Sequence, residues 1–430
     1  MLKNRLPALL VAALIMLTAC AKGEDRPPTD HSSSSAVSQM ESIYRKYDKT
    51  YSSGSFSVRK LTALSGRKDS FIRGVDISLS SAICESGASY GSPQGNREPI
   101  CGILADSGVN AVRIRLFHDY ASPSGTPCGR LDTERVIGMI KEARQYGLQV
   151  ILDLHYSDTW ADPGHQSVPY AWKDDSYEEL KTDVYQYTRD VLAEIKGRAL
   201  SVDFLQIGNE IQGGMLFPHG QIDWENPDES FDRLTGLLEQ GSKAAREIFP
   251  GCRIIIHTAN GLYRWTNEND WGSAGLFFYQ ELEKRSLDYD IVGASFYPFE
   301  DDTPIPCISG LIDLYKEAIN KPVMIMETSY AYTYEWNDLT DNIFYRDKEL
   351  AGYPVSFQGQ TDYLLDVMEA VASAKQDNGI GVCWWGGEWI PNRDRNMRTS
   401  WANQALFTYE GIASPTLSAF KKCLPDDRQE

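Results

Sequence analysis

The chain has 430 residues with a formal net charge of -18, and 42% of the residues are hydrophobic. This charge argues against a nucleic-acid partner, whose phosphates demand a basic surface, and it makes a neutral ligand a better fit than a polyanionic one. The 10 Trp and 23 Tyr residues suit either a large core or a site in which sugar rings stack on aromatic side chains.

The first residues have the pattern of an export signal. Lys3 and Arg5 precede an apolar stretch over residues 6–17, which is too short to span a bilayer comfortably. The Leu-Thr-Ala-Cys sequence that ends at Cys20 resembles the lipobox of bacterial lipoproteins, in which this cysteine becomes the first mature residue and carries lipid. We therefore expect residues 1–20 to be a lipoprotein signal peptide, with an ordinary secretory signal as the alternative.

Residues 21–45 contain Pro-Pro, a run of Ser and several charged residues, and they offer too little apolar surface for a core. Such a composition predicts a flexible tether. Lipid on Cys20 would then attach the protein to a membrane through this tether. We expect a location in the cell envelope, at the outer membrane and exposed at the cell surface.

From residue 71 onward, short apolar runs alternate with longer amphipathic stretches. The runs cover residues 72–77, 109–117, 150–155, 202–207, 253–257, 291–297, 323–327 and 379–385. The stretches between them, such as 133–146 and 177–196, have the apolar spacing of helices. Strands that alternate with helices predict a (β/α)8 TIM barrel, an α/β fold, as a single domain over residues 46–430.

A doubly wound parallel sheet is the alternative fold. It usually carries a Gly-rich phosphate-binding turn after its first strand, and the sequence has no such turn there. The last segment, 404–423, is expected to supply the eighth helix and a closing tail.

Two glutamates follow apolar runs at the expected carboxyl ends of strands, where (β/α)8 barrels place their catalytic groups. Glu210 follows the fourth run, and Glu327 ends the seventh. A single Glu at such a point is more often a cap or an ion-pair partner. Two carboxyl groups that face each other across a barrel mouth instead predict glycoside hydrolysis, which needs them about 5–5.5 Å apart in the retaining mechanism.

Further polar and aromatic side chains lie near the same strand ends. Arg113, in the second run, would keep Glu327 ionised if the two residues pair. The other candidates for a sugar-binding cleft are His155, Asp158, Trp160, Asn209, Tyr297 and Trp385. Each of these alone would more often be a core or ion-pair residue, and only their clustering at strand ends favours a site.

Four stretches resemble glycoside hydrolase family 53, the endo-β-1,4-galactanases. They are H-Y-S-D-T-W-A-D-P-G at 155–164, Q-I-G-N-E-I-Q-G-G at 206–214, M-E-T-S-Y at 326–330 and S-W-A-N-Q-A-L-F at 400–407. The first stretch is the most specific, and the similarity extends over roughly residues 71 to 420.

The resemblance implies that Glu210 is the acid/base and Glu327 the nucleophile of a retaining mechanism that uses no cofactor. Asn209 would hold the sugar 2-hydroxyl, and Trp385 would form the floor on which the sugar ring stacks.

The same resemblance gives roles to the surrounding residues. Arg113, His155 and Tyr297 would shape the pocket around the nucleophile. Asp158, Trp160 and Asp162 would help to hold the third loop and the neighbouring subsites.

The sequence departs from the family pattern at three places on the rim. Phe-His-Asp-Tyr at 117–120 replaces a Trp-Asn-Asp-Pro-like run. In Trp-Trp-Gly-Gly-Glu-Trp at 384–389, the acidic residue stands at a different position from that in the family pattern. Glu300 stands where the family has Trp after Tyr-Pro-Phe. These changes leave the two glutamates in place and bear on the number of subsites.

The main hypothesis is therefore a monomeric, lipid-anchored endo-β-1,4-galactanase that cleaves neutral β-1,4-galactan side chains of pectin. A mannanase or cellulase of the same clan is the first alternative, and a non-catalytic glycan-binding surface lipoprotein is the second. Some bacterial relatives hold calcium in a late loop, but the sequence has no compact Asp-rich loop, so no metal is predicted.

The sequence contains 8 Cys, and lipidation of Cys20 would leave an odd number, so at least one thiol stays free. Cys84, Cys101 and Cys128 lie in apparent loops and are expected to form disulfides. Cys383 lies in an apolar run and is expected to be a buried thiol. No C-x-x-C or His–Cys cluster predicts a zinc site.

Overall fold

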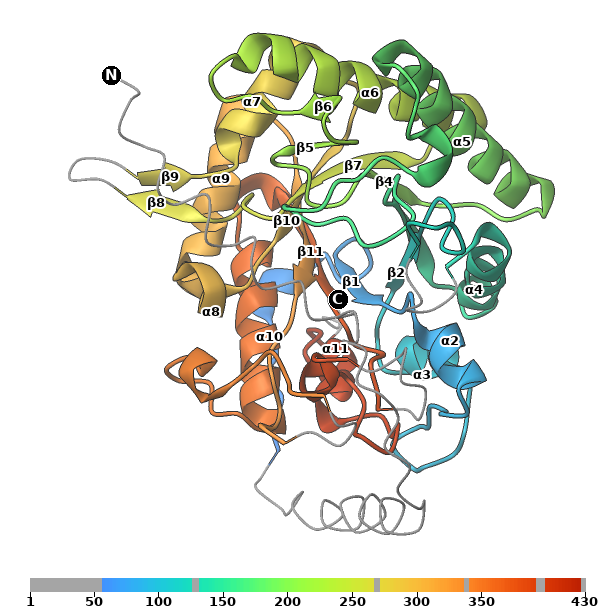
Figure 1. Ribbon diagram of the computed structural model, residues 1–430. Coiled ribbons are helices and arrows are strands. Elements are labelled where there is room, and N and C mark those ends of the chain that lie inside the picture. Colours follow the sequence, from blue (N-terminus) through green and yellow to red (C-terminus); the bar gives the residue numbers. More distant parts are fainter. Residues whose placement is uncertain (1–55, 126–130, 267–270, 336–339, 392–398, 427–430) are drawn as a thin grey trace, which may run out of the picture.

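The computed structural model describes residues 56–125, 131–266, 271–335, 340–391 and 399–426 (Figure 1). The expected signal peptide, the lipidation site at Cys20 and the tether over residues 21–45 therefore lie outside the described residues.

All eight apolar runs form strands of a closed, parallel barrel, which confirms the predicted (β/α)8 fold. The strands are β1 (Ile72–Asp76), β2 (Ala111–Leu116), β3 (Gln149–Leu154), β4 (Phe204–Ile207), β7 (Arg253–Thr258), β10 (Ile291–Ser295), β11 (Val323–Thr328) and β12 (Gly379–Trp384). Each strand pairs with the next along this series, and β12 pairs in parallel with β1 to close the ring.

The helices surround this barrel (Figure 1). They are α2 (Ser80–Glu85), α3 (Ile100–Asp106), α4 (Thr133–Gln145), α5 (Tyr177–Gly197), α6 (Pro227–Ile248), α7 (Leu276–Lys284), α8 (Pro298–Asp301), α9 (Ile308–Ile319), α10 (Phe357–Ala372) and α11 (Ala419–Lys422). The predicted helices at 133–146 and 177–196 are thus confirmed as α4 and α5.

Three features differ from the simple alternation of strands and helices. The segment 404–423 begins at the end of a 3₁₀ turn (Ala402–Gln404) and then holds a second 3₁₀ turn at Pro415–Ser418 and the short α11 instead of a full eighth helix. Gly411, with a left-handed φ of 76°, and Pro415 are unfavourable within a longer helix. Two hairpins lie in loops that the sequence did not mark as strands. They are β5 (Gly214–Met215) with β6 (Gly220–Gln221), and β8 (Arg264–Thr266) with β9 (Trp271–Ser273).

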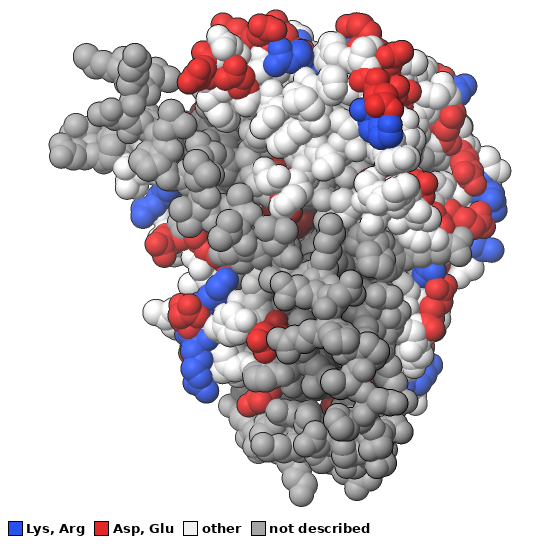
Figure 2. All heavy atoms as spheres, in the orientation of Figure 1, with Lys and Arg blue, Asp and Glu red and all other residues white. Residues whose placement is uncertain are grey.

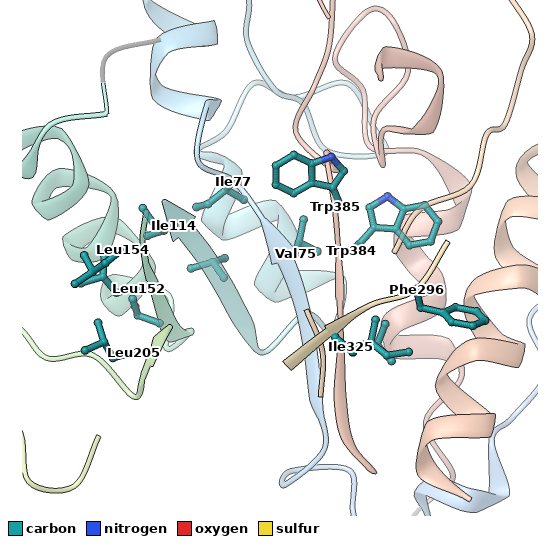
Figure 3. Packing of buried hydrophobic residues seen from close by; sticks show 14 of the residues in the cluster. Val75, Ile77, Ile114, Leu152, Leu154, Leu205, Phe296, Ile325, Trp384 and Trp385 are labelled. Atoms are coloured by element: carbon teal, nitrogen blue, oxygen red, sulfur yellow. The ribbon is translucent and has the colours of Figure 1, made fainter. Parts of the chain in front are cut away.

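Alternate residues of each strand face the barrel interior. Toward the amino ends these residues are apolar and form their own cluster: Ile72, Ala111, Ile151, Phe204, Ile255, Ile291, Met324 and Met326. Toward the carboxyl ends the inward positions become polar, as when Ile151 is followed by Asp153 on β3. The outward residues, including Val75, Ile114 and Leu205, belong to the larger core cluster shown in Figure 3.

A β-bulge changes this alternation in β11. Ala294 of β10 pairs with Ile325 and Ser295 pairs with Glu327, so Met326 is an extra residue without a partner on β10. Met326 belongs to the interior cluster, and strict alternation would turn Glu327 outward. The bulge returns Glu327 to the interior, which illustrates how bulges re-aim side chains next to functional sites.

The expected disulfides of Cys84 and Cys101 are wrong, because both residues are free thiols. They lie in α2 and α3 rather than in loops. Cys128 lies outside the described residues. Cys383 is a buried free thiol in β12, as predicted.

The closure between β12 and β1 leaves no room for a side chain at Gly381, where a Cβ atom would lie 2.7 Å from the carbonyl oxygen of Ile72. We expect Gly381→Ala to destabilise the fold by about 1–3 kcal/mol through overpacking. Gly138 in α4 has open space at the same position, so Gly138→Ala should stabilise the fold by about 1 kcal/mol through helix propensity. Urea unfolding followed by circular dichroism measures both changes. Equal stability of the two variants would contradict this account of the closure.

Candidate active site

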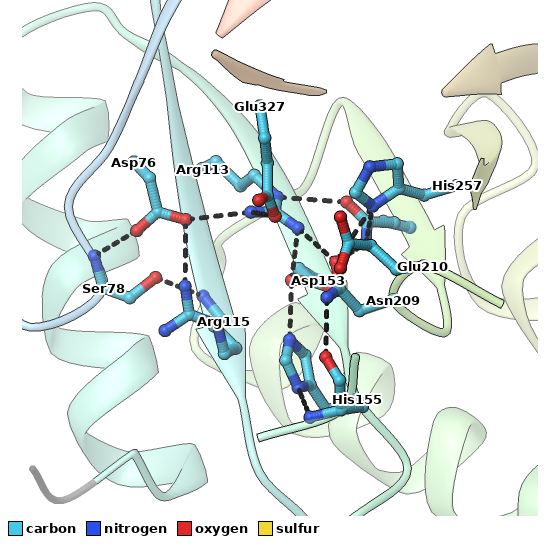
Figure 4. Close-up of polar contacts among 12 residues, drawn as sticks. Asp76, Ser78, Arg113, Arg115, Asp153, His155, Asn209, Glu210, His257 and Glu327 are labelled. Carbon is cyan, nitrogen blue, oxygen red and sulfur yellow. Dashed lines mark hydrogen bonds and ion pairs between the residues drawn. The ribbon is translucent and has the colours of Figure 1, made fainter. Parts of the chain in front are cut away.

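A buried arginine lies at the centre of the carboxyl ends of the strands. Arg113, on β2, is fully buried, and its guanidinium group meets acceptors from four other strands and the loop after β4 (Figure 4). These acceptors are Glu327 Oε1 at 2.9 Å, Asp76 Oδ2 at 3.2 Å, Asp153 Oδ2 at 2.8 Å, Asn209 Oδ1 at 2.8 Å and Gln206 Oε1 at 3.0 Å. The expected pairing of Arg113 with Glu327 is therefore present.

Burial alone would lower the pKa of Arg113, but the carboxylates of Asp153 and Glu327 outweigh this effect and raise it. The same attraction acts on Asp153, where burial would raise the pKa and Arg113 instead brings it down to about 2. Arg113 and Asp153 thus form a permanently charged pair at neutral pH. This pair fixes the cation beside Glu327.

The side chain of Glu327 is held at both oxygens. Oε1 accepts from Arg113, and Oε2 accepts from the Tyr297 hydroxyl at 3.3 Å. Burial raises the pKa of Glu327, and the cations of Arg113 and Arg115 oppose that rise. Tyr297 therefore lies where it was expected, against the proposed nucleophile.

Glu210 lies on a sharp turn immediately after β4. Gly208 and Glu210 both have left-handed backbone conformations, with φ of 74° and 51°, and the second of these is strained for a residue other than glycine. The Glu210 side chain is buried, and its Oε1 lies 2.7 Å from Ser295 Oγ. Its Oε2 has no hydrogen-bond partner among the described residues.

Burial and the negative charge of Glu327 hold the pKa of Glu210 well above its usual range. Glu210 thus keeps its proton under conditions in which Glu327 is paired with a cation. Two carboxyl groups whose environments separate their pKa values in this way can serve as a proton donor and a nucleophile. Glycoside hydrolysis is the reaction that uses such a pair.

Asn209 lies between the two catalytic candidates and is held on three sides. Its Oδ1 accepts from Arg113, its Nδ2 donates to the Ala161 carbonyl oxygen at 2.8 Å, and its own carbonyl accepts from Gln166. The described residues provide no acceptor for the second N–H of the Asn209 amide, so it can donate to a sugar hydroxyl.

His155 is buried, and both of its ring nitrogens have partners within the protein. The Ala161 backbone N–H donates to Nδ1 at 3.0 Å, so Nε2 carries the proton and donates to Asp153 at 3.1 Å. Burial lowers the pKa of His155, in line with this neutral form. His155 thus positions Asp153, and through it Arg113.

Trp160, Trp385 and Trp389 form an aromatic wall beside the charged centre. The ring centroids of Trp160 and Trp385 lie 6.0 Å apart in an edge-to-face arrangement. The guanidinium group of Arg115 lies between these two rings, at 4.1 Å from Trp160 and 4.7 Å from Trp385. Clustering of the predicted aromatic residues Trp160 and Trp385 is therefore observed.

Asp158 is buried among hydrogen-bond donors of two loops. It accepts from the side chains of His118, Ser122 and Ser124 and from the backbone N–H groups of Asp119 and Tyr170. This arrangement fits the expected role of Asp158 in holding the third loop. Its contact with a bound sugar stays a prediction.

Several residues of the centre were not singled out from the sequence. They are Asp76, Asp153, Gln206, His257, Ser295 and Glu388. Asp153, Gln206 and His257 each lie two residues after an apolar inward residue of the same strand, and Asp76 lies four residues after one. A search for the change from apolar to polar inward positions along each strand would therefore have found these four residues. Ser295 and Glu388 do not show this pattern. Ser295 is recognised only by its contact with Glu210, and Glu388 lies in a loop.

Within the described residues, no group of three or more His, Cys, Asp and Glu side chains could hold a metal ion. The polar side chains around Arg113 are instead used by hydrogen bonds and ion pairs among themselves.

Comparison with known proteins gives one consistent family. The model of glycosyl hydrolase family 53 matches residues 72–420. An endo-beta-1,4-galactanase of Bacillus subtilis (strain 168) is 32% identical over 391 residues, which cover 83% of this chain and 86% of that protein. An arabinogalactan endo-beta-1,4-galactanase of Thermothelomyces thermophilus is 32% identical over 359 residues, which cover 81% of this chain and 98% of that protein.

The solved structure of an Ignisphaera aggregans GH53 catalytic domain matches the fold with a TM-score of 0.78 at 31% sequence identity. The match covers 86% of this chain and 100% of that domain. The resemblance inferred from the four sequence stretches is thus confirmed, and this chain belongs to glycosyl hydrolase family 53.

Proposed function

We propose that the protein is a retaining endo-β-1,4-galactanase that cleaves internal bonds of neutral galactan, as found in pectin side chains. The observation that carries this proposal is the contrast between two buried carboxyl groups. Glu327 accepts from Arg113 and Tyr297, whereas Glu210 has no ion pair among the described residues and its pKa is held well above the usual range by burial and by the charge of Glu327.

In the first step, Glu327 attacks the anomeric carbon while Glu210 gives its proton to the leaving sugar oxygen. The glycosidic bond breaks, and an ester forms between the sugar and Glu327. In the second step, water gives a proton to Glu210 and its oxygen attacks the same carbon, which releases the sugar and the Glu327 carboxylate. The free N–H of Asn209 donates to the sugar 2-hydroxyl, a contact that strengthens in the transition state.

The substrate assignment draws on the names of the two galactanase relatives and on the charge of this chain. On the face shown in Figure 2, charged side chains gather toward the outer edge, and the described surface between them is mostly uncharged. A neutral polysaccharide fits such a surface better than a polyuronic acid does.

We also propose that lipid on Cys20 anchors the enzyme at the outer membrane, exposed to the medium. The Leu-Thr-Ala-Cys sequence supports this proposal. Within the described ranges, no helix is both long and apolar enough to cross a membrane. Labelling of the full chain with a radioactive fatty acid tests the anchor, and label that persists in Cys20→Ala would reject Cys20 as the attachment site.

Linear β-1,4-galactan should release galacto-oligosaccharides when incubated with residues 21–430. We expect no release from β-mannan or cellulose run in parallel, and separation of the products by chromatography over time measures all three. Products from mannan or cellulose instead of galactan would favour another β-glycanase of the clan. Binding of galactan without release by the folded protein would favour a glycan-binding protein.

Glu210→Ala should lower galactan turnover about 10²–10⁴-fold, the usual contribution of a general acid/base. An aryl β-1,4-galactobioside with a good leaving group needs little acid assistance. Added azide should therefore attack the galactobiosyl-enzyme in place of water and restore turnover, with a β-galactobiosyl azide as the product. Chromatography and NMR of the azide product measure rescue and anomeric configuration together. Glu388→Ala is the matched control, because Glu388 is a second buried glutamate and accepts from the Leu79 backbone N–H instead of facing Ser295. Equal rescue of both variants would reject Glu210 as the acid/base.

A further inference from the structure

A chain of hydrogen bonds runs from Glu210 through Ser295 and His257 to Asn209. Glu210 Oε1 lies 2.7 Å from Ser295 Oγ, and Ser295 Oγ lies 3.0 Å from His257 Nε2. His257 Nδ1 lies 2.9 Å from Asn209 Oδ1. Figure 4 shows His257 beside Glu210 and Asn209, and all four side chains are buried.

The neighbours of Asn209 determine which nitrogen of His257 carries the proton. Arg113 donates to Asn209 Oδ1, and Asn209 Nδ2 donates to the Ala161 carbonyl oxygen, so the amide has one orientation. His257 Nδ1 lies 2.9 Å from the amide oxygen of Asn209 and 3.3 Å from Gln206 Nε2. The two protons of Gln206 Nε2 have nearer acceptors in the Gly208 carbonyl oxygen at 2.9 Å and Asn209 Oδ1 at 3.1 Å, so an unprotonated Nδ1 would bring two lone pairs together. Nδ1 therefore carries the proton, which makes Nε2 an acceptor in the neutral ring.

His257 is fully buried and close to Arg113, and its burial and this cation lower its pKa well below the usual value. The ring is therefore neutral, and Nε2 needs a donor. Ser295 is the residue within reach of Nε2, and it has one hydroxyl proton to give.

Ser295 thus lies between two acceptors when Glu210 is ionised, and one of them must stay unsatisfied. When Glu210 is protonated, every group along the chain from Glu210 Oε1 to Asn209 Oδ1 has a partner, and only Glu210 Oε2 stays without one among the described residues. The Glu210 carboxyl donates to Ser295 Oγ, the Ser295 hydroxyl donates to His257 Nε2, and Nδ1 donates to Asn209. A buried polar group without a partner costs free energy, so the complete chain favours the protonated state.

We propose that His257 and Ser295 are positioning residues that hold Glu210 in its protonated form before the sugar is cleaved. This inference rests on the proposed role of Glu210 as acid/base. A half-turn of the carboxyl group about its Cγ–Cδ bond presents the proton to the leaving oxygen. Ser295 then donates to the Glu210 carboxylate, and the proton that Glu210 takes from water in the second step restores the chain.

The protonation equilibrium of Glu210 also depends on other charged groups around Glu210 and His257. Glu327 on β11 and Asp162 in the loop after β3 disfavour an ionised Glu210, and Arg113 on β2 favours it. Tyr297 follows β10, and its hydroxyl contacts Glu327 Oε2. His257 faces Arg113, and also Asp153 and His155 on and after β3. None of these groups would change in a substitution of His257.

The tautomer of His257 can be measured in the wild-type protein, with one variant used only to assign the signals. The protein has 6 His, and ¹⁵N NMR of the imidazole rings distinguishes a protonated Nδ1 from a protonated Nε2. The His257 signals are those that disappear in His257→Gln. We expect a protonated Nδ1 and an unprotonated Nε2 in the wild-type protein at neutral pH. A protonated Nε2 would overturn the proposal, whether or not the protein hydrolyses galactan.

Two substitutions of His257 separate its two contacts. His257→Asn places an amide N–H near Asn209 and removes the acceptor for Ser295, whereas the longer His257→Gln can present an amide oxygen to Ser295. In His257→Asn, the Ser295 hydroxyl is free to stabilise the Glu210 carboxylate. The alkaline limb of kcat/KM for galactan should therefore move down by about one pH unit or more, and His257→Gln should remain close to wild type.

The Ser295 hydroxyl is proposed to couple His257 to Glu210, and Ser295→Ala removes this hydroxyl. In the Ser295→Ala protein, a further His257→Asn substitution should leave the alkaline limb of kcat/KM unchanged. Thermal unfolding followed by circular dichroism confirms that each variant is folded. An unchanged limb in folded His257→Asn, or an equal shift in both His257 variants, would overturn the proposal. Absence of galactan hydrolysis by the wild-type protein would count against the proposed function instead, and the tautomer measurement would still decide this inference.

Discussion

The site depends on the buried cation of Arg113. A fully buried guanidinium group is tolerated only when carboxylates and amide oxygens surround it, and Arg113 has such acceptors on β1, β3, β4 and β11. These strands come together only when the barrel closes, so the ion-pair network can form only in the closed barrel. Because Glu327 is one of the acceptors, the interaction that stabilises the buried charge also compensates the charge of the proposed nucleophile.

The two glutamates show how one fold gives two carboxyl groups different chemistry. Glu327 reaches the barrel interior through a bulge and meets Arg113, so its negative charge is compensated. Glu210 leaves β4 on a strained turn and meets Ser295, a neutral residue, so burial and the charge of Glu327 keep its proton in place. A proton donor and an attacking carboxylate are the parts that double displacement requires.

The sequence predicts those features that depend on local pattern. Alternation of apolar residues located the strands, and the position of Glu210 and Glu327 at strand ends located the site. Features that depend on tertiary contact were missed or wrong. The extra residue Met326 looks like any other strand residue, and the contact between His257 and Ser295 joins β7 to β10. The expected disulfides of Cys84 and Cys101 are wrong because pairing depends on the distance between thiols, which the spacing along the chain does not give, and both thiols are free.

The most direct test of this account is to trap the glycosyl-enzyme. A 2-deoxy-2-fluoro-β-galactobioside with a good leaving group should form the ester quickly and hydrolyse it slowly, because fluorine destabilises both transition states. Proteolysis and mass spectrometry then identify the labelled residue. The account predicts one fluorogalactobiosyl group on Glu327. Label on another carboxylate, or turnover of galactan with no covalent intermediate and inverted products, would contradict it.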